Sequence, residues 1–139
     1  MAKLQLSVVS QEKSLINTQV DAVTAVTASG EITVLPGHIP LFTKLDTGVL
    51  RFTEDSSTQS IIISKGFLSV SVDSIVTVMA DTAVAERDIS VSQAEAAIKQ
   101  AKETILTSED RRERIMAEAS LRRALLEIRV AQRTKRTKI

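Results

Sequence analysis

The chain has 139 residues, which suffices for one average domain or for a small domain with an appendage. It contains no cysteine, so disulfides, thiolate zinc sites, iron–sulfur ligation and cysteine nucleophiles are excluded. The net charge of +1 is unevenly divided: residues 111–139 hold ten basic and three acidic residues, against 8 and 14 before them. The sequence therefore predicts a mildly acidic body with a basic C-terminal segment, which favours a partner with an acidic surface.

Neither a leader nor a membrane span is predicted. The first ten residues, MAKLQLSVVS, alternate polar with apolar positions and lack the continuous apolar stretch of a secretory signal. No later segment approaches the run of about 18 apolar residues that a membrane helix needs. We expect a soluble chain that is at most peripheral to a membrane.

Up to about residue 86 the hydrophobic pattern has a period of two, which is typical of β-strands. Leu4, Leu6 and Val8 alternate with polar residues, residues 67–72 alternate in the same way, and residues 75–80 are rich in β-branched side chains. Turns predicted over residues 53–60 and 72–74 separate strands at intervals of roughly 8–12 residues. This spacing favours an antiparallel sandwich or barrel over parallel βαβ units.

Residues 35–42, LPGHIPLF, contain both prolines and the single histidine, His38. Pro36 and Gly37 suit the two central positions of a type II turn, and Pro40 holds Ile39 extended. His38 has no second histidine, cysteine or motif-like serine to act with, so a structural or contact role is favoured over catalysis or metal ligation. A small hydrolase that uses His38 is the enzyme alternative, and no motif supports it. No metal and no cofactor are predicted.

After Asp88, alanine, glutamate, lysine and arginine dominate, and the pattern becomes helical. Ser90 with Gln93 fits an N-cap, and residues 107–110, TSED, supply a break followed by a second capping signal. The second helix is expected to end near residue 132. The apolar positions of the first helix are Ala94, Ala97, Ile98, Ala101 and Ile105, and those of the second are Ala117, Leu121, Ala124, Leu125, Ile128 and Ala131.

The predicted fold class is therefore α+β, with an antiparallel β-sandwich in residues 1–87 and an antiparallel α-helical hairpin in residues 88–139. Because alanine dominates the apolar faces of the hairpin, little large apolar surface is buried there. Two hypotheses remain open at this point: a hairpin that can detach, and a hairpin that is docked permanently on the sandwich.

Arginines recur on one face of the second helix, at Arg122, Arg129, Arg133 and Arg136, and Arg123 and Lys135 flank them. Three interpretations are open: a solvated face, a surface that docks on an acidic protein, and a nucleic-acid-binding face. Nucleic acid is the alternative function of the whole chain. No aromatic residue follows Phe67, so this alternative depends on phosphate contacts without base stacking.

Three segments together resemble the ε subunit of F-type ATP synthases over essentially the full length. They are GEITVLPGHIPLFTKLDTGVLR (residues 30–51), KGFLSVSVDSIVTVMADTAVAERDI (residues 65–89) and a helical hairpin that contains LRRALLEIRVAQRTKR. The resemblance includes the LPGHxPL loop, the GxL step at Gly48–Leu50, the glycine–aromatic pair Gly66–Phe67 and the strand VTVMADTA. The order of the two predicted parts also agrees with that family.

The resemblance implies a non-catalytic subunit of the central stalk. Its sandwich would contact the γ subunit and the ring of c subunits through Glu31, His38 and Phe42. Its helices would switch between folded and extended states, and when extended would dock on the α and β subunits through the arginine face and inhibit ATP hydrolysis. The implied location is the cytoplasmic face of the bacterial inner membrane, peripheral through the complex, with the plastid thylakoid as the alternative.

The sequence departs from the family at two places. Some bacterial ε subunits bind ATP through an I/L-D-x-x-R-A motif, but Ser90 and Gln93 replace its acid and its arginine here. Arg123 matches a phosphate-contacting arginine of those proteins, whereas Glu127 stands where they carry another. We therefore expect no ATP site. Lys65 replaces the first residue of the usual double glycine before Phe67.

Overall fold

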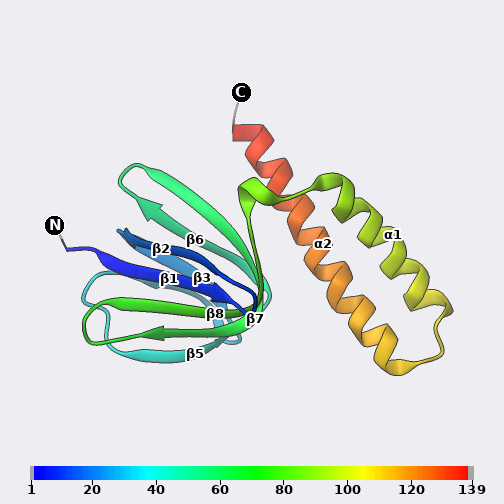
Figure 1. Cartoon of the computed structure of the whole chain (residues 1–139), viewed down its shortest axis with the longest axis horizontal. Helices are drawn as coiled ribbons and strands as arrows, with labels where there is room; N and C mark the ends of the chain where they lie inside the picture. Colours follow the sequence, from blue (N-terminus) through cyan, green and yellow to red (C-terminus); the bar gives the residue numbers. More distant parts are fainter. Residues whose placement is uncertain (1, 138–139) are drawn as a thin grey trace. The chain divides into compact units, whose positions relative to one another are not determined.

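The computed structural model describes the backbone of residues 2–137 and the side chains of residues 2–132. The chain forms two compact units, Met1–Ala85 and Glu86–Ile139. The predicted α+β class is confirmed, since the first unit consists of strands and the second of helices (Figure 1). The elements are β1 (Leu4–Ser10), β2 (Ser14–Val20), β3 (Ala22–Thr27), β4 (Gly30–Val34), β5 (Leu41–Leu45), β6 (Gly48–Glu54), β7 (Ser57–Val70), β8 (Ile75–Ala85), the short 3-10 helix η1 (Glu86–Asp88), α1 (Val91–Thr107) and α2 (Arg111–Thr137).

The strands of the first unit form a folded sheet in the order β2-β1-β8-β7-β5-β3-β4, and β6 pairs with both β3 and β7. The long strand β7 takes part in both layers, because its first half pairs with β6 and its second half with β5. The pairs are antiparallel except β1 with β8, which run parallel. The sequence pattern did not predict this parallel pair, since it joins strands at opposite ends of the unit.

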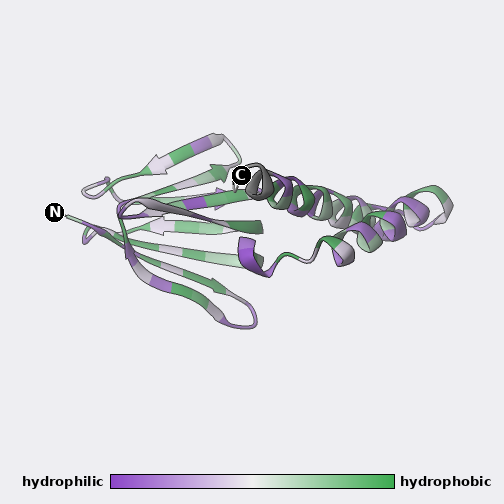
Figure 2. Ribbon diagram, turned by 90° about the horizontal axis from the view of Figure 1, so that it is seen from above, coloured by the Kyte–Doolittle hydropathy of each residue, from purple (hydrophilic) through white to green (hydrophobic). Residues whose placement is uncertain are grey.

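The core of the sandwich lies between the two layers. The inward positions expected from the alternation are confirmed in β1, where Leu4, Leu6 and Val8 are completely buried. Alternating apolar and polar colours along the strands show the same pattern (Figure 2). Further core residues are Val20, Val23, Ala25, Val34, Leu45, Leu50, Phe52, Ile61, Ile63, Leu68, Val70, Val76, Val78 and Ala80.

The turn predicted over residues 53–60 is shorter than expected. Strand β6 continues to Glu54 and β7 begins at Ser57, so that only Asp55 and Ser56 lie between the two strands. Asp55 adopts the positive φ of 56° that such a tight turn requires. The prediction was wrong because residues 57–59 are polar and exposed, and polarity does not prevent strand pairing at a solvent-facing end of a hairpin.

Capping residues define the helical hairpin at the predicted positions. The Ser90 hydroxyl accepts a hydrogen bond from the Gln93 amide at 3.3 Å, which confirms the expected N-cap of α1. At the break between the helices, the Asp110 carboxylate accepts from the Arg112 amide at 2.9 Å. The helices then run antiparallel (Figure 1). Helix α2 continues to Thr137, past the end predicted near residue 132.

The packed face of the hairpin is narrower than predicted. Its buried residues include Ala94, Ala101, Ala117 and Ala124. Leu125, which was expected on this face, is 46% exposed. The reason is geometric: Leu125 lies about 100° round the helix from Ala124, and a seam lined by alanine is too narrow to cover it.

Candidate functional site

The LPGHIPLF segment forms the predicted type II turn. Gly37 has a φ of 84°, and the His38 amide donates to the Leu35 carbonyl at 3.0 Å. No other atom lies within 4 Å of the position that a Cβ at Gly37 would occupy. Position 37 therefore requires glycine because of its positive φ, and not because a side chain there would clash with a neighbour.

The turn orients His38 and exposes its apolar neighbours. His38 is partly buried, and its Nδ1 lies 2.7 Å from the Ile39 carbonyl oxygen, a local contact that holds the ring. Leu35 is exposed, and Ile39 is 75% exposed. The segment therefore presents aliphatic surface to solvent beside an oriented imidazole.

The strand β5, which begins at the end of this segment, carries one half of an aromatic pair. The rings of Phe42 in β5 and Phe67 in β7 stack with their centroids 5.5 Å apart. Met79 in β8 is the cross-strand partner of Phe67, and Ile75 begins the same strand. We call these four exposed residues, Phe42, Phe67, Ile75 and Met79, the outer apolar patch.

The outer apolar patch has the chemistry of a protein-binding surface. Aromatic residues and methionine are enriched at interfaces, and neighbouring exposed apolar side chains on a soluble domain commonly mark interaction sites. Phe42 was predicted as a contact residue through the family resemblance, whereas Phe67, Ile75 and Met79 were missed. A signal was available: all three are apolar at the outward positions of strands whose inward positions are also apolar.

Glu31 lies away from the outer apolar patch in the sheet order. It is in the edge strand β4, which β3 separates from β5. Its carboxylate accepts a hydrogen bond from the Arg51 guanidinium at 3.2 Å across the sheet. The structure therefore does not bring the three predicted contact residues into one cluster: Glu31 is on an edge strand, and His38 and Phe42 are in the loop and strand that follow it.

The predicted arginine face is present on α2 as far as the side chains are described. Arg122 and Arg129 are exposed, and Arg123 is partly buried. Arg133 and Arg136 lie outside the residues whose side chains are described. Leu125 contributes exposed aliphatic surface to the same helix, so this surface is both cationic and apolar.

The residues that depart from the ATP-binding motif have other positions in the hairpin. The hydroxyl of Ser90 is occupied as the N-cap of α1, and Gln93 is exposed in the first turn of that helix. Glu127 is partly buried in α2. A carboxylate at that place repels a phosphate group that an arginine would attract.

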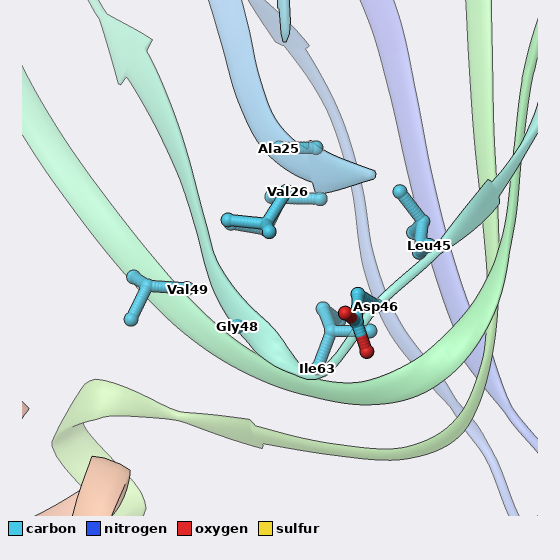
Figure 3. Close-up of a pocket in the computed structure, with 8 residues that line it drawn as sticks. Ala25, Val26, Leu45, Asp46, Gly48, Val49 and Ile63 are labelled. Carbon is cyan, nitrogen blue, oxygen red and sulfur yellow. The ribbon is translucent and has the colours of Figure 1, made fainter. Parts of the chain in front are cut away.

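A dimple in the sandwich surface surrounds Gly48 (Figure 3). It is lined by residues that include Val26, Asp46 and Val49, and it has no room for a water molecule. A Cβ at Gly48 would lie 2.9 Å from the Cβ of Val26, so glycine allows β6 to approach β3 closely. The GxL step seen in the sequence thus serves packing, with Leu50 buried two residues later.

Among the side chains described, those of residues 2–132, no group of three or more histidine, aspartate or glutamate residues is placed to hold a metal ion. Within residues 2–137, no helix has the length and hydropathy required to span a bilayer.

The fold and its surface define a class of protein: a small β-sandwich with an exposed aromatic patch, followed by an α-helical hairpin with a basic face. Residues 3–86 match the family model described as ATP synthase, Delta/Epsilon chain, beta-sandwich domain. The chain belongs to the ATP synthase epsilon chain family, as the following relatives show.

An ATP synthase epsilon chain of Dehalococcoides mccartyi is 36% identical over 144 residues, which cover 98% of this chain and 97% of the relative. Another, from Citrifermentans bemidjiense, is 37% identical over 136 residues and covers 96% and 97%. A third, from Carboxydothermus hydrogenoformans, is 41% identical over 103 residues, or 74% of this chain and 76% of the relative.

Two solved structures are similar to the chain. One is a chain of the Euglena gracilis mitochondrial ATP synthase, OSCP/F1/c-ring, with a TM-score of 0.74 and 28% identity. The match covers 87% of this chain and 76% of that one. The other is from the central stalk/c-ring of the Tetrahymena thermophila mitochondrial ATP synthase, with a TM-score of 0.66 and coverage of 94% and 97%. At 14% identity, the second match shows the fold alone.

Proposed function

We propose that the chain is a non-catalytic central-stalk subunit of an F-type ATP synthase. In this proposal residues 1–87 bind the γ subunit and the ring of c subunits, and residues 88–139 regulate ATP hydrolysis. The observation that carries the proposal is the outer apolar patch, a solvent-exposed aromatic surface in a domain whose core is already complete. The similar chain of the Euglena gracilis OSCP/F1/c-ring structure supports the same location.

The γ subunit is the proposed occupant of the outer apolar patch. Rigid aromatic side chains on a sheet lose little conformational entropy on binding, and Phe42 and Phe67 already stack on each other in the free chain. Glu31 and His38 are the proposed polar contacts to the stalk and ring. The Glu31–Arg51 ion pair orients the Glu31 carboxylate before any partner arrives.

The hairpin is the proposed inhibitory element. Its buried seam consists largely of alanine, so separating α1 from α2 exposes little large apolar surface. In the extended state, the basic face of α2 would dock on acidic surfaces of the β subunits and contact α. The exposed Arg122 and Arg129, together with Leu125, supply both charge and aliphatic area for this contact.

The location that follows from this proposal is peripheral. Association with a membrane-bound complex places the chain at the membrane through its partners. The bacterial relatives favour the cytoplasmic face of the inner membrane.

Truncation tests the division of labour between the two units. A chain that ends after Arg87 keeps the complete first unit and its core, so it should fold, bind γ and support assembly. In complexes reconstituted from purified subunits, the same truncation should raise the rate of ATP hydrolysis relative to the full chain. Equal hydrolysis rates for the two chains would contradict the inhibitory role, and failure of the truncated chain to bind γ would contradict the role of the sandwich.

Charge substitutions test the docking of α2. The double variant Arg122→Ala with Arg129→Ala should relieve inhibition in part, because each exposed ion pair contributes only about 0.2–1 kcal/mol. The matched control is Lys99→Ala with Lys102→Ala, which removes two exposed cations from α1. Added salt should weaken inhibition by the native chain and change the arginine variant less, since exposed pairs are screened over about 10 Å at 0.1 M ionic strength. Equal effects of the two double variants would contradict a specific role for the α2 face.

A further inference from the structure

Two turns that are far apart in the sequence meet at one end of the sandwich. The first is the type II turn of residues 35–38, and the second joins β7 to β8 through residues 71–75. The second turn is closed by hydrogen bonds from the Ser71 amide to the Ile75 carbonyl at 2.9 Å and from the Ser74 amide to the Ser71 carbonyl at 3.2 Å. The Gly37 amide donates to the Ser74 hydroxyl oxygen at 3.1 Å and so links the two turns.

The hydrogen bond from the Gly37 amide to Ser74 involves the peptide group whose orientation determines the turn type. Type I and type II turns differ mainly by a rotation of the central peptide plane, here the peptide between Pro36 and Gly37. The rotation reverses the direction of the Gly37 N–H. An acceptor at Ser74 therefore stabilises the type II orientation over the type I orientation, and with it the directions of Leu35, His38 and Ile39.

Ser74 occupies a backbone conformation that is unfavourable for serine. Its φ is 59°, a region that glycine and asparagine adopt at lower cost. Glycine at this position would satisfy the backbone but would provide no acceptor for Gly37. What serine contributes at position 74, and glycine would not, is therefore the hydroxyl that accepts the hydrogen bond from the Gly37 amide.

We propose that Ser74 is a positioning residue for γ binding, and that the turn it belongs to is part of the same binding surface. This inference rests on the proposed function of the outer apolar patch. Ile75 of that patch follows Ser74 directly, and Phe42 lies in the strand that follows Ile39, so the patch continues into both turns. Val72, at 81% exposed, and Ile39 then add aliphatic area beside the patch for the γ subunit.

The experiment uses the full chain, with two readouts: amide hydrogen exchange at Gly37 in the free chain, and affinity for purified γ subunit. Ser74→Ala should raise the exchange rate of Gly37 and weaken γ binding about fivefold, the equivalent of one neutral hydrogen bond. Ser74→Asn should retain both, because its side-chain carbonyl can accept from Gly37 and asparagine tolerates positive φ. Ser71→Ala is the matched control, since its hydroxyl accepts only within its own turn, from the Ile75 amide at 3.3 Å.

Each of the following results would contradict a different step of the inference. Unchanged Gly37 exchange in Ser74→Ala would show that the hydrogen bond does not hold the turn. Faster Gly37 exchange with unchanged γ affinity in Ser74→Ala would show that the turn is not used in binding. In that case, weaker γ binding by Phe67→Ser would still support the proposed function of the patch. Equal losses in Ser71→Ala and Ser74→Ala would show a general destabilisation of the turn. If Phe67→Ser also binds γ normally, the proposed function of the patch fails as well.

Discussion

The rings of Phe42 and Phe67 stack across the β5–β7 pair, with 5.5 Å between centroids and an angle of 20° between ring planes. They are diagonal neighbours in the sheet, because Phe42 is paired with Ser69 and Phe67 with Lys44. Both rings are exposed, Phe42 by 65% of its surface. The surface that these rings expose in the free chain can be buried only against a partner, and aromatic residues are enriched among those that contribute most to binding.

Phe67→Ser should accordingly weaken binding to the γ subunit about 10- to 100-fold, the range of a central interface residue. The free energy of unfolding of the free chain should fall by less than about 1 kcal/mol, because the ring is not part of the core. Titration of γ and urea denaturation measure the two effects. Gln59→Ala, an exposed position elsewhere in β7, should change neither, and a loss of stability without a loss of affinity would contradict the role of the patch.

Gly37→Val should destabilise the sandwich by roughly 1–3 kcal/mol, since a β-branched residue is strained at a φ of 84°. The cost is conformational, because the added Cβ meets no other atom within 4 Å. Thermal melting measures the effect, and Gly37→Asn is the control, because asparagine tolerates positive φ. A lower melting temperature for the valine variant than for the asparagine variant would show that strain, and not the loss of glycine itself, is the cause. An unchanged melting temperature for the valine variant would contradict the strain argument.

Lys65→Gly should raise the stability of the chain. Lys65 has a φ of 61° within β7, so the lysine that replaces the family's usual glycine is strained, at a cost of about 1–2 kcal/mol. The entropy that glycine loses on folding offsets part of this gain, which leaves an expected increase of about 0.5–1 kcal/mol. Lys65→Ala keeps the strained backbone and removes the charge. Equal melting temperatures for Lys65→Gly and Lys65→Ala would indicate that loss of the charge, and not relief of strain, causes the gain in stability.

Stability should decline at high pH through Lys3. Hydrogen bonding of its ammonium group to Asp55 at 3.0 Å, assisted by the charges of Asp21 and Asp55, raises the pKa of Lys3 above its ordinary value of 10.5. The charged lysine therefore stabilises the folded state fully below pH 10.5, and this contribution is lost as the pH rises through the raised pKa.

Urea denaturation at several alkaline pH values tests this expectation. The difference in unfolding free energy between the native chain and Lys3→Met should shrink above pH 10.5. Lys13→Met, which removes an exposed lysine from the β1–β2 turn, is the matched control variant. A Lys3 difference that stays constant with pH would show that the aspartates do not stabilise the ammonium form.

ATP should bind the isolated chain no more tightly than about 1 mM, because Gln93 and Glu127 replace two cationic phosphate partners of the ATP-binding relatives. The structure adds that the Ser90 hydroxyl already serves as a helix cap. Titration calorimetry measures the affinity, and Glu127→Arg should strengthen it if the site is otherwise intact. Micromolar binding by the native chain would show that other residues hold the nucleotide.

Local patterns in the sequence were sufficient for the two helices, for some of the strands and for one turn. The alternation around Leu6, the capping serine Ser90 and the Pro36–Gly37 pair each depend on interactions within a few residues, so they could be predicted without the fold. The family resemblance added Glu31, His38 and Phe42 as contact residues. Phe67 and Met79 were missed, because the patterns of residues 67–72 and 75–80 indicated only strands and did not show that these side chains adjoin Phe42.

The tertiary structure alone decided which distant residues meet. The parallel pairing of β1 with β8, the stacking of Phe42 on Phe67 and the bond from Gly37 to Ser74 all join segments that the sequence separates by 25 or more positions. Such contacts depend on strand order and register, which result from the burial of the whole core and not from any local preference. The elements are therefore a property of the local sequence, and the proposed binding surface is a property of the assembled sandwich.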